Sequence, residues 1–215
     1  MLAAVETATA FGSLYERVAR DALEHGAPGA TVAAAASVAL HLTPWSAAAW
    51  QDRAWAAARA GDRAAALQAS TRALALDPAS AYAWQEQAQI YAYFGDLGPA
   101  YEARLARAQS LGAGWRQVQY RNALTGAALW ESGTPSERLM WGASQRHALE
   151  YDFTEFTRDL LRLDLDQSFC REHAADAPYK LRKWCERAAK VRAGCAVENI
   201  RPDVLAWCQQ NKLAP

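Results

Sequence analysis

The sequence predicts an all-α fold, an α-solenoid of about three helix pairs followed by a helical C-terminal cap with a four-cysteine segment. The main observation is a repeat with an offset of 34 residues, in which Trp50 returns as Trp84 and Gly61-Asp62 as Gly95-Asp96. A Trp near the start of each unit and a Gly turn are typical of stacked helix-turn-helix units of this period. The second observation is the alanine-rich composition of the same segments, which favours helices.

The solenoid is predicted to span residues 13–114, after a flexible N-terminal tail over residues 1–12 that is rich in Ala and Thr and has no helix cap. The alternative is that this segment forms part of the first helix. Its first unit is a degenerate helix pair broken at Gly26-Ala27-Pro28-Gly29. In the second unit Gly61 supplies the turn and Asp62 caps the helix that follows, and the third unit has the same pattern. The expected helices are residues 14–25 and 30–42, then 47–60 and 63–76, then 81–94 and 97–111.

The repeat is lost after Gly114, but helical patterns continue to the end of the chain. Thr134, Pro135 and Glu137 form a helix start, with an N-cap, a proline at the first helical position and a capping box. Residues 115–165 are therefore predicted as a helical extension or cap, with helices at 115–131, 136–150 and 153–163. Residues 166–215 are predicted to form a cysteine-containing tail with short helices at 166–173, 178–191 and 201–210.

The cysteines are confined to this tail, at Cys170, Cys185, Cys195 and Cys208. An even number in one small segment is typical of a disulfide framework in an oxidising compartment. The tail is also too small to bury a stable core without cross-links. Three pairings are open. Free buried thiols and a zinc site are the alternatives, although the spacing contains no CxxC or CxxH pair.

Composition and motifs exclude several function classes. The 23 acidic and 23 basic residues balance, whereas nucleic-acid-binding surfaces show a basic excess, so we do not expect a nucleic-acid partner. No catalytic motif is present, and we expect no catalytic residue, cofactor or metal; His147 and Glu150 are better explained as a solvated helix face. No segment is apolar over the roughly 18 residues of a membrane span, and the start does not match a signal peptide.

The repeated residues resemble the tetratricopeptide repeat (TPR) family over about residues 13–112. Arg53 and Gln87 depart from the family pattern, which usually has Leu there. The resemblance implies that the first helix of each unit lines a concave groove. Its mixture of aromatic rings, amides and few charges suits an extended peptide or a glycan. The implied groove residues are Arg17, Asp21, Gln51, Trp55, Arg59, Tyr82, Gln85, Gln89 and Tyr93. The alternative is that Trp55 and Tyr93 pack against neighbouring helices and leave no open groove.

A second resemblance includes ARLARAQSLG at 103–112 and VQYRNALTGAALW at 118–130, which together are similar to TPR-type accessory proteins of bacterial exopolysaccharide clusters. It implies a non-catalytic scaffold or adaptor that faces the periplasm and works with membrane-embedded polysaccharide or secretion machinery, with a leader or anchor lying outside this sequence. One alternative is a cytoplasmic, co-chaperone-like adaptor for peptide tails, which would need a basic clamp and has only Arg17 and Arg59. Another is an enzyme subunit with an unrecognised site.

Overall fold

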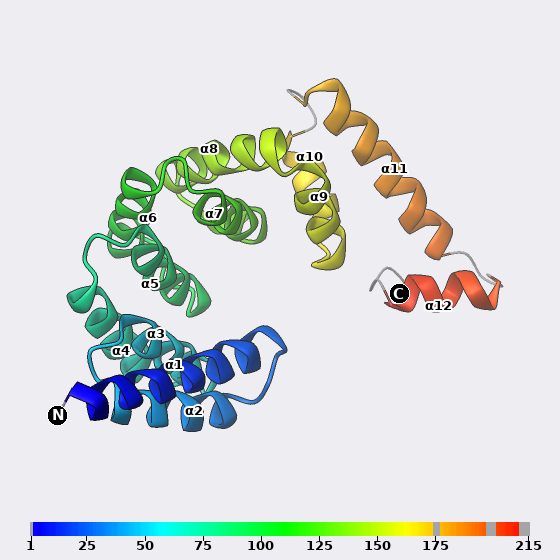
Figure 1. Cartoon of the computed structure of the whole chain (residues 1–215). Helices are drawn as coiled ribbons and strands as arrows, with labels where there is room; N and C mark the ends of the chain where they lie inside the picture. Colours follow the sequence, from blue (N-terminus) through cyan, green and yellow to red (C-terminus); the bar gives the residue numbers. More distant parts are fainter. Residues whose placement is uncertain (1, 174–176, 197–200, 211–215) are drawn as a thin grey trace. The chain divides into compact units, whose positions relative to one another are not determined.

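The computed structural model describes residues 2–173, 177–196 and 201–210, and all regular elements in these ranges are helices (Figure 1). The chain divides into two compact units, unit 1 over residues 1–118 and unit 2 over residues 119–215. Helices that are neighbours in sequence pack against each other in both units. The all-α prediction is therefore confirmed at this level.

Unit 1 is built from helical hairpins. Helices pack in the pairs α1·α2, α3·α4 and α5·α6, and α3 also packs against α1 and α5 (Figure 1). Most of the buried side chains are alanines, which allow helix axes to approach closely. The helices are α1 (Leu2–Glu24), α2 (Gly29–Leu42), α3 (Ala47–Arg59), α4 (Arg63–Leu76), α5 (Ala81–Tyr93), α6 (Pro99–Leu111) and the start of α7 (Arg116–Leu129).

Residues separated by 34 positions make equivalent bonds in the second and third hairpins. Trp50 Nε1 donates a hydrogen bond to the Pro44 carbonyl at 3.0 Å, and Trp84 Nε1 donates to the Pro78 carbonyl at 2.9 Å. Each tryptophan thereby ties the first turns of its helix to the proline-containing connection before it. The repeat in the sequence is thus a repeat in the local structure.

The turns and caps of the two hairpins agree in part. Gly61 and Gly95 have φ of 78° and 73°, the left-handed region that favours glycine. Asp62 caps α4 by accepting from the Ala65 amide at 2.9 Å, as predicted. Asp96 does not repeat this role, because Gly98 is the N-cap of α6 and Pro99 sets its first turn. Asp96 instead accepts from Arg63 Nε at 2.5 Å.

The predicted N-terminal tail needs correction, because residues 2–12 are the first half of α1. Gly12 is buried against Thr43, and a Cβ built on it would lie 2.6 Å from Thr43 Cγ2. The glycine thus allows a close contact that holds this part of α1. Packing of this kind stabilises most protein helices, and a cap pattern does not indicate it because the residues in contact are distant in sequence.

Unit 2 has a larger-residue core, in which Phe156, Leu160, Phe169 and Leu181 are buried together. The predicted helix start is present as a capping box, with Thr134 Oγ1 accepting from the Glu137 amide at 3.1 Å and Glu137 Oε2 accepting from the Thr134 amide at 2.7 Å. The elements are the rest of α7, a 3₁₀ turn (Trp130–Ser132), α8 (Pro135–Tyr151), α9 (Phe153–Arg162), α10 (Asp166–His173), α11 (Tyr179–Cys195) and α12 (Pro202–Gln210). The predicted tail end, residues 211–215, lies outside the described residues.

Candidate binding surfaces

The predicted groove residues lie on α1, α3 and α5, but they are not equally accessible. They divide into exposed residues (Arg17, Asp21, Arg59, Tyr93), partly exposed residues (Trp55, Tyr82, Gln89) and buried residues (Gln51, Gln85). Buried amides cannot meet a ligand without a rearrangement of the packed helices. The open part of the predicted groove therefore lies mainly on α1 and at the ends of α3 and α5.

Two of the exposed residues already have structural contacts. Arg59 donates to the carbonyls of Leu23 at 2.7 Å and Ala27 at 3.0 Å, and so ties α3 to the end of α1. Tyr93 contacts Trp55 edge-on, with ring centroids 6.1 Å apart. Arg59 is thus engaged with backbone carbonyls, whereas Tyr93 keeps 54% of its surface exposed.

A buried charge cluster lies between the first helices of the hairpins. Arg20 Nη2 lies 2.7 Å from Asp52 Oδ1, and Arg20 Nη1 lies 3.9 Å from Glu86 Oε1. Trp55 Nε1 donates to the second oxygen of Glu86. Burial raises the pKa of Asp52 to about 7, against the opposing attraction of Arg20. Part of the predicted groove is therefore a packed polar layer. The sequence contained one sign of this layer, because Asp52 and Glu86 are separated by the 34 residues of the repeat.

An exposed apolar stripe runs along α1 and was not predicted as a site. Phe11, Leu14, Tyr15 and Val18 are 54%, 52%, 37% and 47% exposed. Their spacing of i, i+3, i+4 and i+7 puts them on one helix face. We call this surface the α1 stripe. Large contiguous apolar surface of this kind marks interaction sites in soluble proteins.

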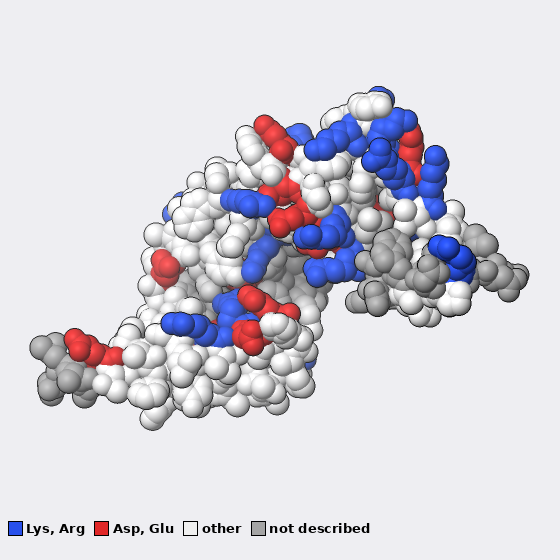
Figure 2. All heavy atoms as spheres, turned by 45° about the vertical axis from the view of Figure 1, so that its right-hand side comes forward, with Lys and Arg blue, Asp and Glu red and all other residues white. Residues whose placement is uncertain are grey.

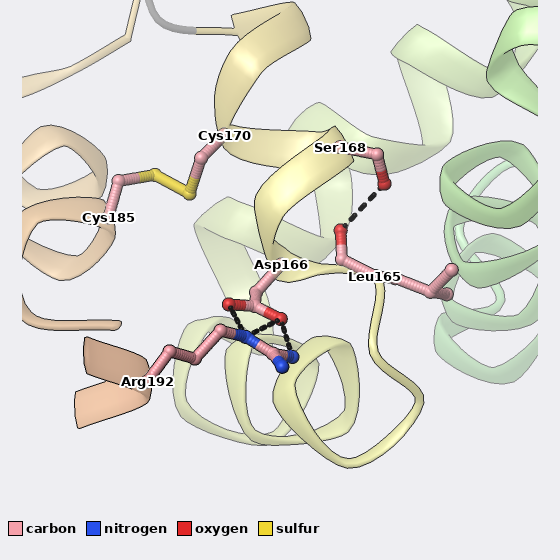
Figure 3. The surroundings of a disulfide bond; sticks show 6 residues. All are labelled: Leu165, Asp166, Ser168, Cys170, Cys185 and Arg192. Atoms are coloured by element: carbon pink, nitrogen blue, oxygen red, sulfur yellow. Dashed lines mark hydrogen bonds and ion pairs between the residues drawn. A yellow bond between two sulfur atoms is a disulfide. The ribbon is translucent and has the colours of Figure 1, made fainter. Parts of the chain in front are cut away.

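The four cysteines form two disulfides, Cys170–Cys185 and Cys195–Cys208. These bonds confirm the disulfide prediction and select one of the three pairings, so no thiol is left for zinc. Figure 3 shows a second link between the helices of the first bond, in which Arg192 of α11 donates to the buried Asp166 of α10, with Nε 2.7 Å from Oδ2. Both disulfides therefore fasten α11, one to α10 and one to α12.

The α11 helix carries most of the positive charge of this segment. Lys180, Lys183, Arg187 and Lys190 recur at i, i+3, i+7 and i+10, which places them on one face, and Figure 2 shows Lys and Arg gathered in the region of this helix. Lys180 lies over the Phe153 ring at 3.9 Å, and Lys183 pairs with Glu186 at 2.8 Å. These contacts give part of the basic face a structural role.

The described residues contain no group of three or more His, Cys, Asp or Glu side chains placed to hold a metal ion. His147 stacks on Tyr151, with ring centroids 4.6 Å apart. Among the same residues, no helix has the length and apolar character needed to cross a bilayer.

No protein-family model matches the chain, and neither does any curated protein. The two family resemblances therefore rest on the sequence motifs alone and stay predictions.

Proposed function

We propose that this chain is a non-catalytic, TPR-like scaffold or adaptor that binds a protein partner through the α1 stripe. The observation that carries the proposal is the exposure of four large apolar side chains on one helix face. Burying them would contribute about 25 cal/mol for each Å² of apolar surface removed from water. Arg17 and Asp21, from the predicted groove, are exposed on the same helix and supply polar contacts beside the stripe.

The spacing of the stripe suits a partner helix with its own apolar face. Anchors at i, i+3, i+4 and i+7 are the pattern by which amphipathic helices recognise grooves and one another. A glycan in the predicted groove has less support, because Gln51 and Gln85 are buried. A carboxylate clamp for peptide tails also has less support, because Arg59 is engaged with two backbone carbonyls.

The compartment that we propose is an oxidising one, such as the bacterial periplasm. Two disulfides support it, because such bonds form and persist there and are rare in the cytosol. With the resemblance to exopolysaccharide accessory proteins, the proposed partner is a component of membrane-embedded polysaccharide or secretion machinery.

The test begins with a photo-cross-linking amino acid placed at Leu14, with Val38 of α2, 39% exposed and outside the stripe, as the matched control position. A partner captured only from position 14 is then purified, and its affinity is measured for the wild type, for Leu14→Ser/Val18→Ser and for Val38→Ser. We expect the double variant to bind at least about tenfold more weakly and the control to bind normally. Unchanged binding by the double variant would refute the proposed surface.

A further inference from the structure

Unit 2 contains a cavity of about 600 Å³ whose residues have no role in the proposed adaptor function. This volume falls within the range of roughly 300–1,000 Å³ that is usual for small-molecule sites. It is lined on one side by α8 and on the other by the end of α10 and the start of α11. Its main lining residues are Trp130, Leu139, Gln145, Arg146, His173 and Leu181.

Two buried polar atoms at this cavity lack hydrogen-bond partners among the described residues. Gln145 is 1% exposed, and its Oε1 accepts no hydrogen bond. His173 is held between aromatic rings, 5.2 Å from Trp130 and 4.4 Å from Phe169 between centroids, and its Nε2 is also without a partner. Leaving a buried polar group unpaired costs about 1–3 kcal/mol. Like the buried amides of unit 1, Gln145 Oε1 has no accessible surface, so its side chain must turn toward the cavity before a ligand can donate a hydrogen bond to it; that bond would remove part of this cost.

The charged residues that line the cavity differ in what they contact. Glu172 accepts from Trp130 Nε1 at 3.1 Å, and Arg138 donates from Nε to the Trp130 carbonyl at 2.8 Å. Arg146 has no hydrogen bond or ion pair within the part of the chain that the structure describes. A single available guanidinium matches a singly charged carboxylate. Glu150 and Glu172, which also line the cavity, would repel a phosphate dianion more strongly than a singly charged carboxylate.

We propose that this cavity binds a small carboxylate that has an apolar body and an adjacent N–H donor, the chemistry of an N-acylated apolar amino acid. Leu139, Leu149 and Leu181 line the space for the apolar body. Arg146 pairs with the carboxylate, and Gln145 Oε1 accepts from the N–H group. The same chemistry occurs in a free metabolite and at the C-terminus of a peptide.

Gly142 allows the cavity to be filled without damage to the helix. A Cβ added there would lie 3.7 Å from Arg146 Nη1 and 3.9 Å from Trp130 Cη2, both ordinary contacts. Gly142→Leu therefore places its side chain in the cavity, while Gly142→Ala is the matched control. Both replacements favour the helix, by up to about 1 kcal/mol for alanine.

The experiment is calorimetric titration of the 215-residue, disulfide-bonded chain with N-acetyl-L-phenylalanine. We expect a dissociation constant of about 0.1–1 mM, as for a small ligand of this size. Gly142→Leu should weaken binding by at least about tenfold, and Arg146→Gln by about five- to tenfold, while Gly142→Ala binds as the wild type does. Arg146→Gln changes an exposed residue and keeps the test valid if Gly142→Leu does not fold.

Further probes separate the contributions and the sources of the ligand. N-acetyl-L-phenylalaninamide lacks the carboxylate, so it should bind weakly to the wild type and lose nothing further in Arg146→Gln. A tetrapeptide that ends in phenylalanine should match the acid if the natural ligand is a peptide terminus, and should bind more weakly if it is a free metabolite. Equal affinity of wild type and Gly142→Leu, or tighter binding of glucuronate than of N-acetyl-L-phenylalanine, would overturn the proposal.

Discussion

Units 1 and 2 are both helical, but they obtain their stability in different ways. Unit 1 has no cysteine, packs mainly alanines between its helices and buries a charge cluster around Asp52. Unit 2 packs large aromatic residues such as Trp141 and Phe156 and fastens its last helices with two disulfides. A repeated hairpin can use the next hairpin to bury its face, whereas a short non-repeated segment must supply larger side chains and cross-links of its own.

The largest effect that we expect is from Trp141→Ala in unit 2. Trp141 is fully buried, and a Cβ added at Gly126 or Gly133 would lie 2.4 or 2.2 Å from it, so its ring fills space that two glycines leave open. Truncation should reduce the free energy of unfolding by about 3–5 kcal/mol. Urea denaturation measures the change, with Leu139→Ala, 72% exposed, as a control that should change stability little. A loss below about 1 kcal/mol would contradict the description of this core.

The next effect should follow from removal of the Cys170–Cys185 bond with a double serine variant. The two cysteines are 15 residues apart, and closing a loop of that length contributes about 3 kcal/mol in the chain-entropy treatment. Hydrogen exchange measured by mass spectrometry should show faster exchange in α10 and α11. Amides of α3 and α5 in unit 1 serve as the internal reference and should not change. Equal acceleration in both units would show that they do not unfold independently.

The smallest change in a single experimental step is expected from the pH dependence of the two units, at most about 1.4 kcal/mol for each pH unit. Folded Asp52 has a pKa of about 7, above its ordinary 3.8, so the folded state binds this proton more tightly than the unfolded chain. The resulting stabilisation of unit 1 is complete below about pH 4 and is lost as the pH rises to about 7, with a slope of at most about 1.4 kcal/mol per pH unit. Burial lowers the pKa of His173, so folded unit 2 binds this proton less tightly than the unfolded chain does. Unit 2 therefore keeps its full stability above the ordinary histidine pKa and loses stability as the pH falls below it.

Pulse proteolysis at a series of pH values, with fragments assigned by mass spectrometry, follows each unit separately. Asp52→Asn should flatten the decline in unit 1 and leave unit 2 unchanged. Asp77→Asn changes an exposed carboxylate of the same unit and is the control, which should have little effect. A steep decline that persists in Asp52→Asn would assign the titration to another group.

Helix positions were predictable because they depend on short-range signals. The capping box at Thr134, the Asp62 cap and the Gly61 turn each involve residues a few positions apart, and the structure contains all three. The N-terminal half of α1 was missed because no cap marks its start, and the contact of Gly12 with Thr43 at its end joins residues that are distant in sequence. The presence of disulfides followed from cysteine number and location, but their pairing depended on how α10, α11 and α12 pack.

The sequence by itself determined the all-helical class, the 34-residue repeat and the concentration of cysteines at one end, because these features follow from local patterns and composition. Only the tertiary structure decided that Gln51 and Gln85 are buried, that the α1 stripe is exposed and that Gln145 lines a cavity. The exposure of a side chain depends on elements that are distant in sequence and pack over it. A helical period identifies a face of a helix, but it does not identify what covers that face.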